Sequence, residues 1–114
     1  MVTVSLNACT DGGIAVNLSG HADYAEKGKD IVCGAISSLF FGTINGINSF
    51  TGSETMVFEK NYIGGRGSTT LIICKLDSSS DVLLKTMLLQ MQGIAEQYPD
   101  NVNIGEGVED FIKT

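Results

Sequence analysis

The sequence predicts an α+β fold in two layers, with two helices on one face of a mixed or mostly antiparallel sheet. Short segments in which apolar and polar residues alternate predict strands, and two longer segments with apolar residues at helical spacing predict helices. Their order along the chain is β-β-α-β-β-α-β. The 114 residues are 43% hydrophobic and 18% charged, so we expect a single domain over residues 1–114 with a buried core.

The first two strands are expected near residues 2–8 and 13–20. Val2, Val4 and Leu6 alternate with polar residues, and the segment "GIAVNLSG" repeats this pattern. Asp11-Gly12 between them is a typical turn sequence, so the two strands should form a hairpin.

The first helix is expected over residues 30–50, with Asp30 as its N-cap. Gly34, Gly42 and Gly46 each lower its intrinsic stability by about 1 kcal/mol relative to Ala, so tertiary packing must hold it. The apolar face expected at 100° per residue comprises Val32, Ile36, Leu39, Phe40, Thr43, Ile47 and Phe50.

Two further strands are expected at residues 54–62 and 68–76, around the turn "IGGRG". A second helix should start with a capping box formed by Ser78 and Asp81, and it should end before Pro99. The segment 101–107 reads as a short last strand, and the acidic tail beyond it is expected to be loose.

The composition excludes several classes of protein. The net charge of −6 argues against nucleic-acid binding and suits a basic partner. We expect no membrane span, since no run of about 18 apolar residues occurs. The start "MVTVSLNACT" lacks the basic and apolar regions of a secretion signal, so the cytoplasm is the expected compartment.

The three cysteines form no C-x-x-C pair, so reduced thiols are expected. Cys74 lies in an apolar strand and reads as a core residue, and Cys9 lies beside a turn. His21, Asp23, Asp30 and Cys33 have the composition of a metal site but no recognised ligand spacing. No metal or other cofactor is therefore expected.

The chemistry of the chain is expected in "SGHADYAEKGKDIVCGAISSL", residues 19–39. His21, the single histidine, follows a strand, and Cys33 lies in the first turn of a helix. The positive end of a helix favours a thiolate, and a nearby imidazole can accept and later deliver a proton. The amides of Cys33 and Gly34 are expected to point out of the helix end, where they could stabilise an oxyanion.

Two neighbours of this pair have roles that the spacing leaves open. Ser37 lies one turn after Cys33, where its hydroxyl could bond to the Cys33 carbonyl or line a pocket. Asp30 could cap the helix, or it could orient His21. The spacing alone is also compatible with a surface histidine and a small core cysteine.

The same stretch resembles the ribosomal-processing cysteine proteases of Firmicutes, the Prp family. The matching residues are Gly20-His21-Ala22, then Gly28-Lys29-Asp30-Ile31-Val32-Cys33, then Ala35 and Ser37. The sequences "NG" at 45–46 and "AEQYP" at 95–99 also look similar to the family. Gly34 departs from the pattern, in which alanine is expected there.

The resemblance implies that Cys33 is the nucleophile and His21 the catalytic histidine, with Asp30, Ser37 and the possible hinges Gly20 and Gly28 in support. It implies a substrate as well, the N-terminal extension of a large-subunit ribosomal protein, the one numbered twenty-seven. It also implies a homodimer, for which Phe41, opposite the apolar face of its helix, is a candidate contact. The alternatives are a non-catalytic binding module for ribosomal-protein tails and a redox-responsive thiol protein.

Overall fold

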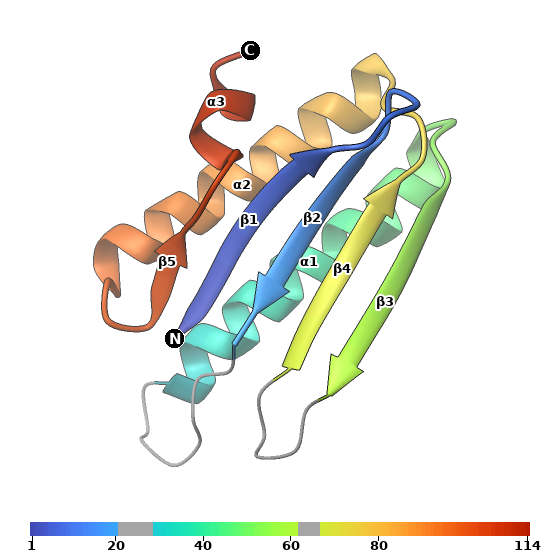
Figure 1. Ribbon diagram of the computed structural model, residues 1–114. Coiled ribbons are helices and arrows are strands. Elements are labelled where there is room, and N and C mark those ends of the chain that lie inside the picture. The colour runs from blue at the N-terminus through green and yellow to red at the C-terminus, as the bar shows by residue number, and fades with distance from the viewer. Residues whose placement is uncertain (21–28, 62–66) are drawn as a thin grey trace.

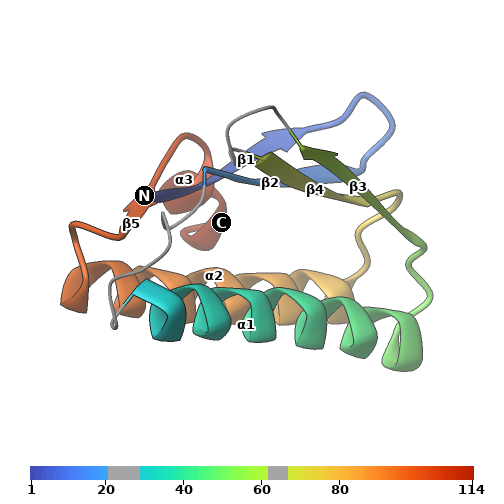
Figure 2. The same ribbon diagram turned by 90° about the horizontal axis from the view of Figure 1, so that it is seen from below.

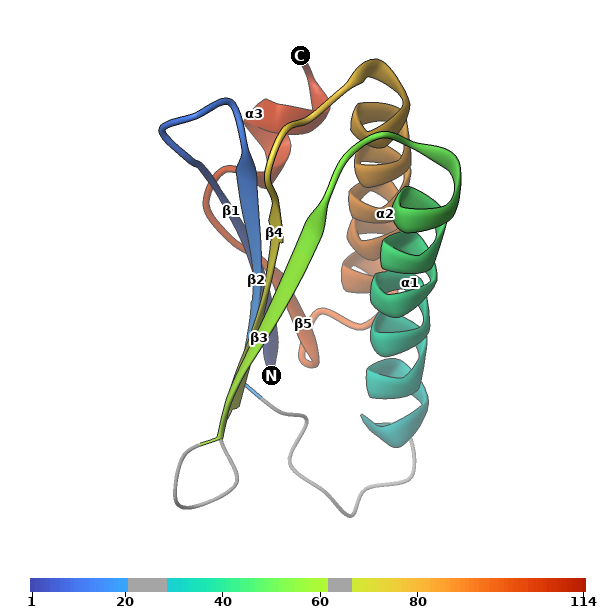
Figure 3. The same ribbon diagram turned by 90° about the vertical axis from the view of Figure 1, so that its right-hand side faces the viewer.

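The computed structural model describes residues 1–20, 29–61 and 67–114. Five strands form one sheet in the order β3-β4-β2-β1-β5. The strands are β1 (Val2–Ala8), β2 (Ile14–Ser19), β3 (Thr55–Asn61), β4 (Gly67–Ile73) and β5 (Val102–Ile104), and the helices are α1 (Lys29–Phe50), α2 (Ser78–Gln97) and α3 (Val108–Ile112). The long helices α1 and α2 cover one face of the sheet, so the predicted two-layer α+β architecture is confirmed (Figures 1, 2 and 3).

The sheet is mixed. β1–β2, β2–β4 and β3–β4 pair antiparallel, whereas β5 returns parallel to β1. Alternate residues of β1, β2 and β4 point towards the helices and are buried, which explains the period-two pattern of the sequence. The predicted hairpin is present, with Ala8 opposite Ile14 at its closed end.

The core lies between the sheet and the apolar faces of α1 and α2. On α1 the buried residues are Val32, Ile36, Phe40, Ile44 and Ile47. The predicted face is correct for Val32, Ile36, Phe40 and Ile47. It is wrong for Phe50, which is 82% exposed, and it omits Ile44, which is buried. On α2 the buried apolar residues are Leu84, Met87, Leu88 and Met91.

The predicted capping box of α2, Ser78 with Asp81, is wrong. Asp77 is the N-cap: its carboxylate accepts from the Ser80 amide at 2.8 Å, and the Ser80 hydroxyl accepts from the Asp77 amide at 2.9 Å. A tertiary contact fixes this register, because the Ser80 hydroxyl is buried and lies 2.8 Å from that of Ser53. The cap holds the Asp77 carboxylate in its charged form, and the hydrogen bond from the Ser80 amide is the main cause of its lowered pKa.

The acidic tail is ordered, contrary to the prediction that it is loose. Residues 108–112 form α3, where Val108 is fully buried and Phe111 and Ile112 pack against the core. The Lys85 ammonium lies 5.3 Å from the centre of the Phe111 ring, which links α3 to α2.

The composition of α1 does not by itself exclude a membrane span. Among the described residues, the segment Ile31–Phe50 of α1 is long and apolar enough to cross a membrane by length and composition alone, with a mean hydropathy of 1.4. This segment contains no charged residue. The core helix of a soluble protein can have the same length and composition, and one face of α1 is packed against this sheet.

Candidate active site

Cys33 lies near the start of α1, on the side of the helix that faces the sheet. Its side chain is half-buried and packs against the edge of the hydrophobic core. The thiol is free, as are those of Cys9 and Cys74. Cys33 is therefore supported by packing on one side and reachable from the other, as a nucleophile requires.

A small cavity of about 100 Å³ lies beside Cys33, between the start of α1 and one end of the sheet. It brings together segments that are far apart in the sequence: the start of β1, the end of β2, the first turns of α1 and the start of β4. The lining residues are Val2, Leu18, Gly20, Cys33, Ile36, Ser37, Gly67, Ser68 and Thr69. Three of the predicted site residues, Gly20, Cys33 and Ser37, thus share one pocket.

Gly20 fixes the backbone at the floor of this pocket. Its φ is +83°, and a Cβ placed there would collide with the Met1 carbonyl oxygen. Its amide donates to the Gly67 carbonyl at 3.0 Å, which ties the end of β2 to the start of β4. The residue after Gly20 is His21, which, like Gly28, lies outside the described residues. The pairing of His21 with Cys33 therefore stays a prediction.

The helix start differs from the sequence prediction. Because α1 begins at Lys29, Asp30 is its second residue and cannot be the N-cap. Cys33 is then the fifth helical residue, beyond the four amides at a helix start that lack an intrahelical acceptor. The expected oxyanion site on the amides of Cys33 and Gly34 is therefore wrong.

The remaining supporting residues lie next to Cys33. Ser37 is exposed and lines the pocket. Within the described part of the chain its hydroxyl does not bond to the Cys33 carbonyl. Gly34 is exposed, and a Cβ added to it would meet no heavy atom within 4 Å, which leaves the approach to Cys33 open. The Asp30 side chain lies outside the described part of the structure.

The other two cysteines lie at the far end of the sheet. The Cys9 amide donates to the Gly13 carbonyl beside the β1–β2 turn, and the Cys74 carbonyl approaches Gly13 closely. Cys33 instead shares its pocket with Leu18 and Gly20, at the opposite end of β2. This separation gives Cys33 no resolving partner among the described cysteines.

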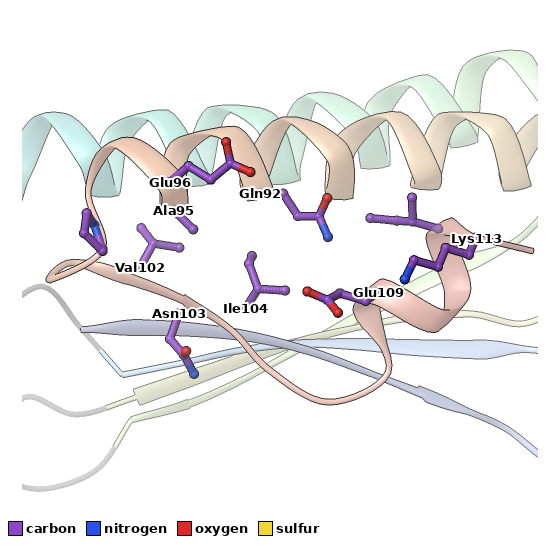
Figure 4. Close-up of a pocket in the computed structure, with 10 residues that line it drawn as sticks. Gln92, Ala95, Glu96, Val102, Asn103, Ile104, Glu109 and Lys113 are labelled. Carbon is purple, nitrogen blue, oxygen red and sulfur yellow. The ribbon is translucent and has the colours of Figure 1, made fainter.

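A larger cavity of about 530 Å³ lies elsewhere, between α2, β5 and α3 (Figure 4). Gln92 and Glu96 border it from α2, Asn103 and Ile104 from β5, and Glu109 from α3. No cysteine lines this larger cavity, so the thiol chemistry belongs to the smaller pocket beside Cys33.

β4 also contributes to the site, which the sequence does not indicate. Gly67, Ser68 and Thr69 reach the pocket because β4 pairs with β2, with Ser68 opposite Ser19. No local sequence pattern predicts which strands are neighbours in the sheet. The glycine at the start of β4, which the turn "IGGRG" contains, was the one available signal.

A reachable cysteine near the start of a helix, beside a pocket at the end of a sheet, is the part of a cysteine-protease site that the described residues include. The family model described as "Cysteine protease Prp" matches residues 1–103. The chain therefore belongs to the Prp family of cysteine proteases, as the resemblance of residues 20–37 implied.

Curated relatives agree with this assignment. The chain is 33% identical over 108 residues to the ribosomal processing cysteine protease Prp of Staphylococcus aureus, and the match covers 91% of this chain and 97% of that protein. It is 24% identical over 111 residues to the Prp of Bacillus subtilis, covering 91% and 96% of the two chains.

Solved structures share the fold. The S. aureus Prp protease in complex with a covalently linked product peptide matches with a TM-score of 0.69 and 31% identity, over 93% of this chain and 99% of that one. A Streptococcus mutans protein matches with a TM-score of 0.77 over 93% of each chain, and at 24% identity it supports the fold alone.

Proposed function

We propose that this chain is a cysteine endopeptidase in which Cys33 is the nucleophile and His21 the general base. The observation that carries the proposal is the pocket beside Cys33. It places the half-buried thiol, the end of β2 at Gly20 and the exposed Ser37 around one small space. His21 follows Gly20 directly in the sequence, and Gly20 lines that space.

The reaction proceeds in two halves. His21 takes the thiol proton, and the Cys33 sulfur attacks the scissile carbonyl carbon and forms a C–S bond. The tetrahedral intermediate collapses as the C–N bond breaks, and His21 delivers its proton to the leaving amine. Water, deprotonated by His21, then attacks the thioester and releases the acid and the free thiol. The dipole of the first turn of α1 stabilises the negative charge in both halves.

The neighbouring residues support this pair. In this proposal Asp30 takes the second of its two predicted roles and orients His21, because α1 begins before Asp30, at Lys29. Ser37 lines the pocket and contacts the substrate. Gly20 holds the backbone before His21 in place, and Gly28, at the other end of that segment, is proposed as the hinge for closure over an extended peptide.

The proposed substrate is the N-terminal extension of the large-subunit ribosomal protein numbered twenty-seven. The relatives named ribosomal processing proteases support a ribosomal protein, and a structural neighbour was solved with a substrate peptide. Ribosomal proteins are basic, and the net charge of −6 on this chain favours their approach. We place the reaction in the cytoplasm and propose that the enzyme is a homodimer that needs no metal or other cofactor and binds neither nucleic acid nor membrane.

The test is cleavage of a synthetic peptide that spans the extension and its junction. Mass spectrometry should detect two fragments with the unmodified chain and none with Cys33→Ala or His21→Ala. Ser37→Ala should slow cleavage without abolishing it. Cys74→Ala is the matched control, because Cys74 is also a half-buried free cysteine but lies away from the pocket, and it should cleave at the normal rate. Cleavage that survives Cys33→Ala would overturn the mechanism.

A further inference from the structure

The outer edge of β3 is an uncovered surface on this molecule. Within residues 1–20, 29–61 and 67–114, β3 is the last strand of the sheet and β4 is its one neighbour. Met56 and Phe58 are 46% and 53% exposed, Val57 is 39% exposed, and Phe50 at the end of α1 is almost fully exposed. A long edge strand with apolar side chains pairs readily with another strand unless something covers it.

The opposite edge of the sheet lacks these features. β5 is only three residues long, and none of its residues is among the exposed large hydrophobic ones. Short edge strands are one of the ways in which proteins prevent unwanted pairing. The difference singles out β3 as the edge that is built to be covered.

The backbone of β3 has the hydrogen-bonding groups for this. The Glu54 carbonyl accepts from the Cys74 amide at 3.0 Å, so the backbone groups of residue 54 face β4. Because these groups alternate along an antiparallel pair, those of Met56 and Phe58 also face β4, and those of Thr55, Val57 and Glu59 face outwards. The outward groups form a ready template for one more antiparallel strand.

We propose that the strand that covers β3 is β3 of a second copy of this chain, paired antiparallel about Val57. In this register Val57 lies opposite Val57 of the second copy, and the two residues exchange backbone hydrogen bonds. Met56 lies opposite Phe58 of the second copy, and Glu54 lies opposite Lys60 of the second copy. Both pairs occur twice by symmetry, so apolar side chains meet apolar ones and opposite charges meet.

Charge complementarity selects this occupant and this register. A two-fold axis normal to the sheet keeps each side chain on its own face, so residues of the same parity must face one another. Pairing about Phe58 would place Met56 against a lysine, and pairing about Glu59 would place two glutamates together. Neither Glu54 nor Lys60 forms an ion pair within the described ranges, so both are available for the contact.

This inference rests on the homodimer proposed above and names its surface. The predicted candidate, Phe41, is 45% exposed, but its ring already packs edge-on against Phe40 with centroids 5.3 Å apart. The β3 edge offers unpaired backbone groups in addition to apolar side chains, so it is the stronger candidate.

The test is sedimentation of the full chain over a range of concentrations. Lys60→Glu should weaken the dimer about ten-fold at low salt, since two attractive pairs become repulsive. Glu54→Lys should weaken it similarly, and the double variant Glu54→Lys/Lys60→Glu should restore the dimer. Val57→Pro removes an amide that faces outwards, so it should dissociate the dimer while leaving the pairing with β4 intact.

Leu89→Lys is the matched control, because Leu89 is 58% exposed on α2, and it should leave the dimer unchanged. If none of the β3 substitutions weakens the dimer, or if Leu89→Lys dissociates it, the β3 interface is wrong although the chain is a homodimer. A chain that is monomeric at every concentration would overturn both. Protection of the β3 amides by the substrate peptide in a monomer would assign this edge to substrate instead.

Discussion

Replacing Gly20 by alanine tests how the structure holds the segment before His21. Gly20 has a φ of +83°, a conformation that costs an L-residue about 1–2 kcal/mol. The new methyl group would also overlap the Met1 carbonyl oxygen, so the N-terminus or the end of β2 must move. We expect a total loss of about 2–4 kcal/mol in the free energy of unfolding, within the range of severe single substitutions.

Gly12→Ala is the matched control for this experiment. Gly12 has nearly the same φ, +80°, but no atom lies within 4 Å of its Cβ position. It should therefore lose only the conformational part, about 1–2 kcal/mol. The difference between the two variants isolates the collision with Met1.

Thermal unfolding followed by circular dichroism measures both losses. For a domain of this size 1 kcal/mol corresponds to about 4 °C, so Gly12→Ala should unfold about 4–8 °C lower and Gly20→Ala about 8–16 °C lower. At a temperature where both variants are folded, Gly20→Ala should also cleave peptide more slowly, because the backbone before His21 has moved. Equal losses of stability in the two variants would refute the reasoning, since Met1 would then yield freely.

Three further predictions concern the frame around the site. Gly42→Ala should raise the free energy of unfolding by about 0.5–1 kcal/mol in denaturant titration, because Gly42 is exposed within α1 and nothing lies within 4 Å of its Cβ position; a loss would show that the position is packed. The folded-state pKa of Asp77 lies below 3.8, so its carboxylate stabilises the fold above pH 3.8 and loses this effect as the pH falls further. The difference in the free energy of unfolding between the unmodified chain and Asp77→Asn should therefore shrink on acidification, and a constant difference would contradict the cap. Val108→Ala should cost about 2 kcal/mol, since this side chain is fully buried, whereas exposed Glu109→Ala should cost little; equal small effects would mean that α3 does not dock.

The strands and long helices could be predicted because each leaves a local pattern in the sequence. Val2, Val4 and Leu6 alternate, and Val32, Ile36 and Phe40 recur at helical spacing, since each set faces one core. The parallel return of β5 beside β1 and the position of β4 beside β2 leave no such pattern. The contribution of Gly67, Ser68 and Thr69 to the pocket could not be foreseen for this reason.

The errors around α2 and the tail have a common cause. Ser78-Asp81 and Asp77-Ser80 both have the composition of a capping box, and the buried contact between Ser80 and Ser53 decides between them. The acidic composition of the tail predicts a loose segment, yet Val108, Phe111 and Ile112 repeat at helical spacing and pack on the core. In both places tertiary packing overrides the local pattern.

The candidate site was predictable in its residue types more than in its geometry. The sequence indicates Cys33 near a helix start and Gly20 at a strand end, and the structure brings both to one pocket. The predicted helix start is slightly too late, and that error carries over to Asp30 and to the expected oxyanion amides. This shift of the helix start leaves the fold unchanged, but it decides which backbone amides are free to bind an oxyanion.

The most direct test of the proposed chemistry is mass spectrometry of the chain quenched during turnover of the junction peptide. We predict a transient adduct with the mass of the acyl fragment, located by digestion on the peptide that contains Cys33. An adduct on Cys9 or Cys74, or continued cleavage with no adduct on any cysteine, would contradict it.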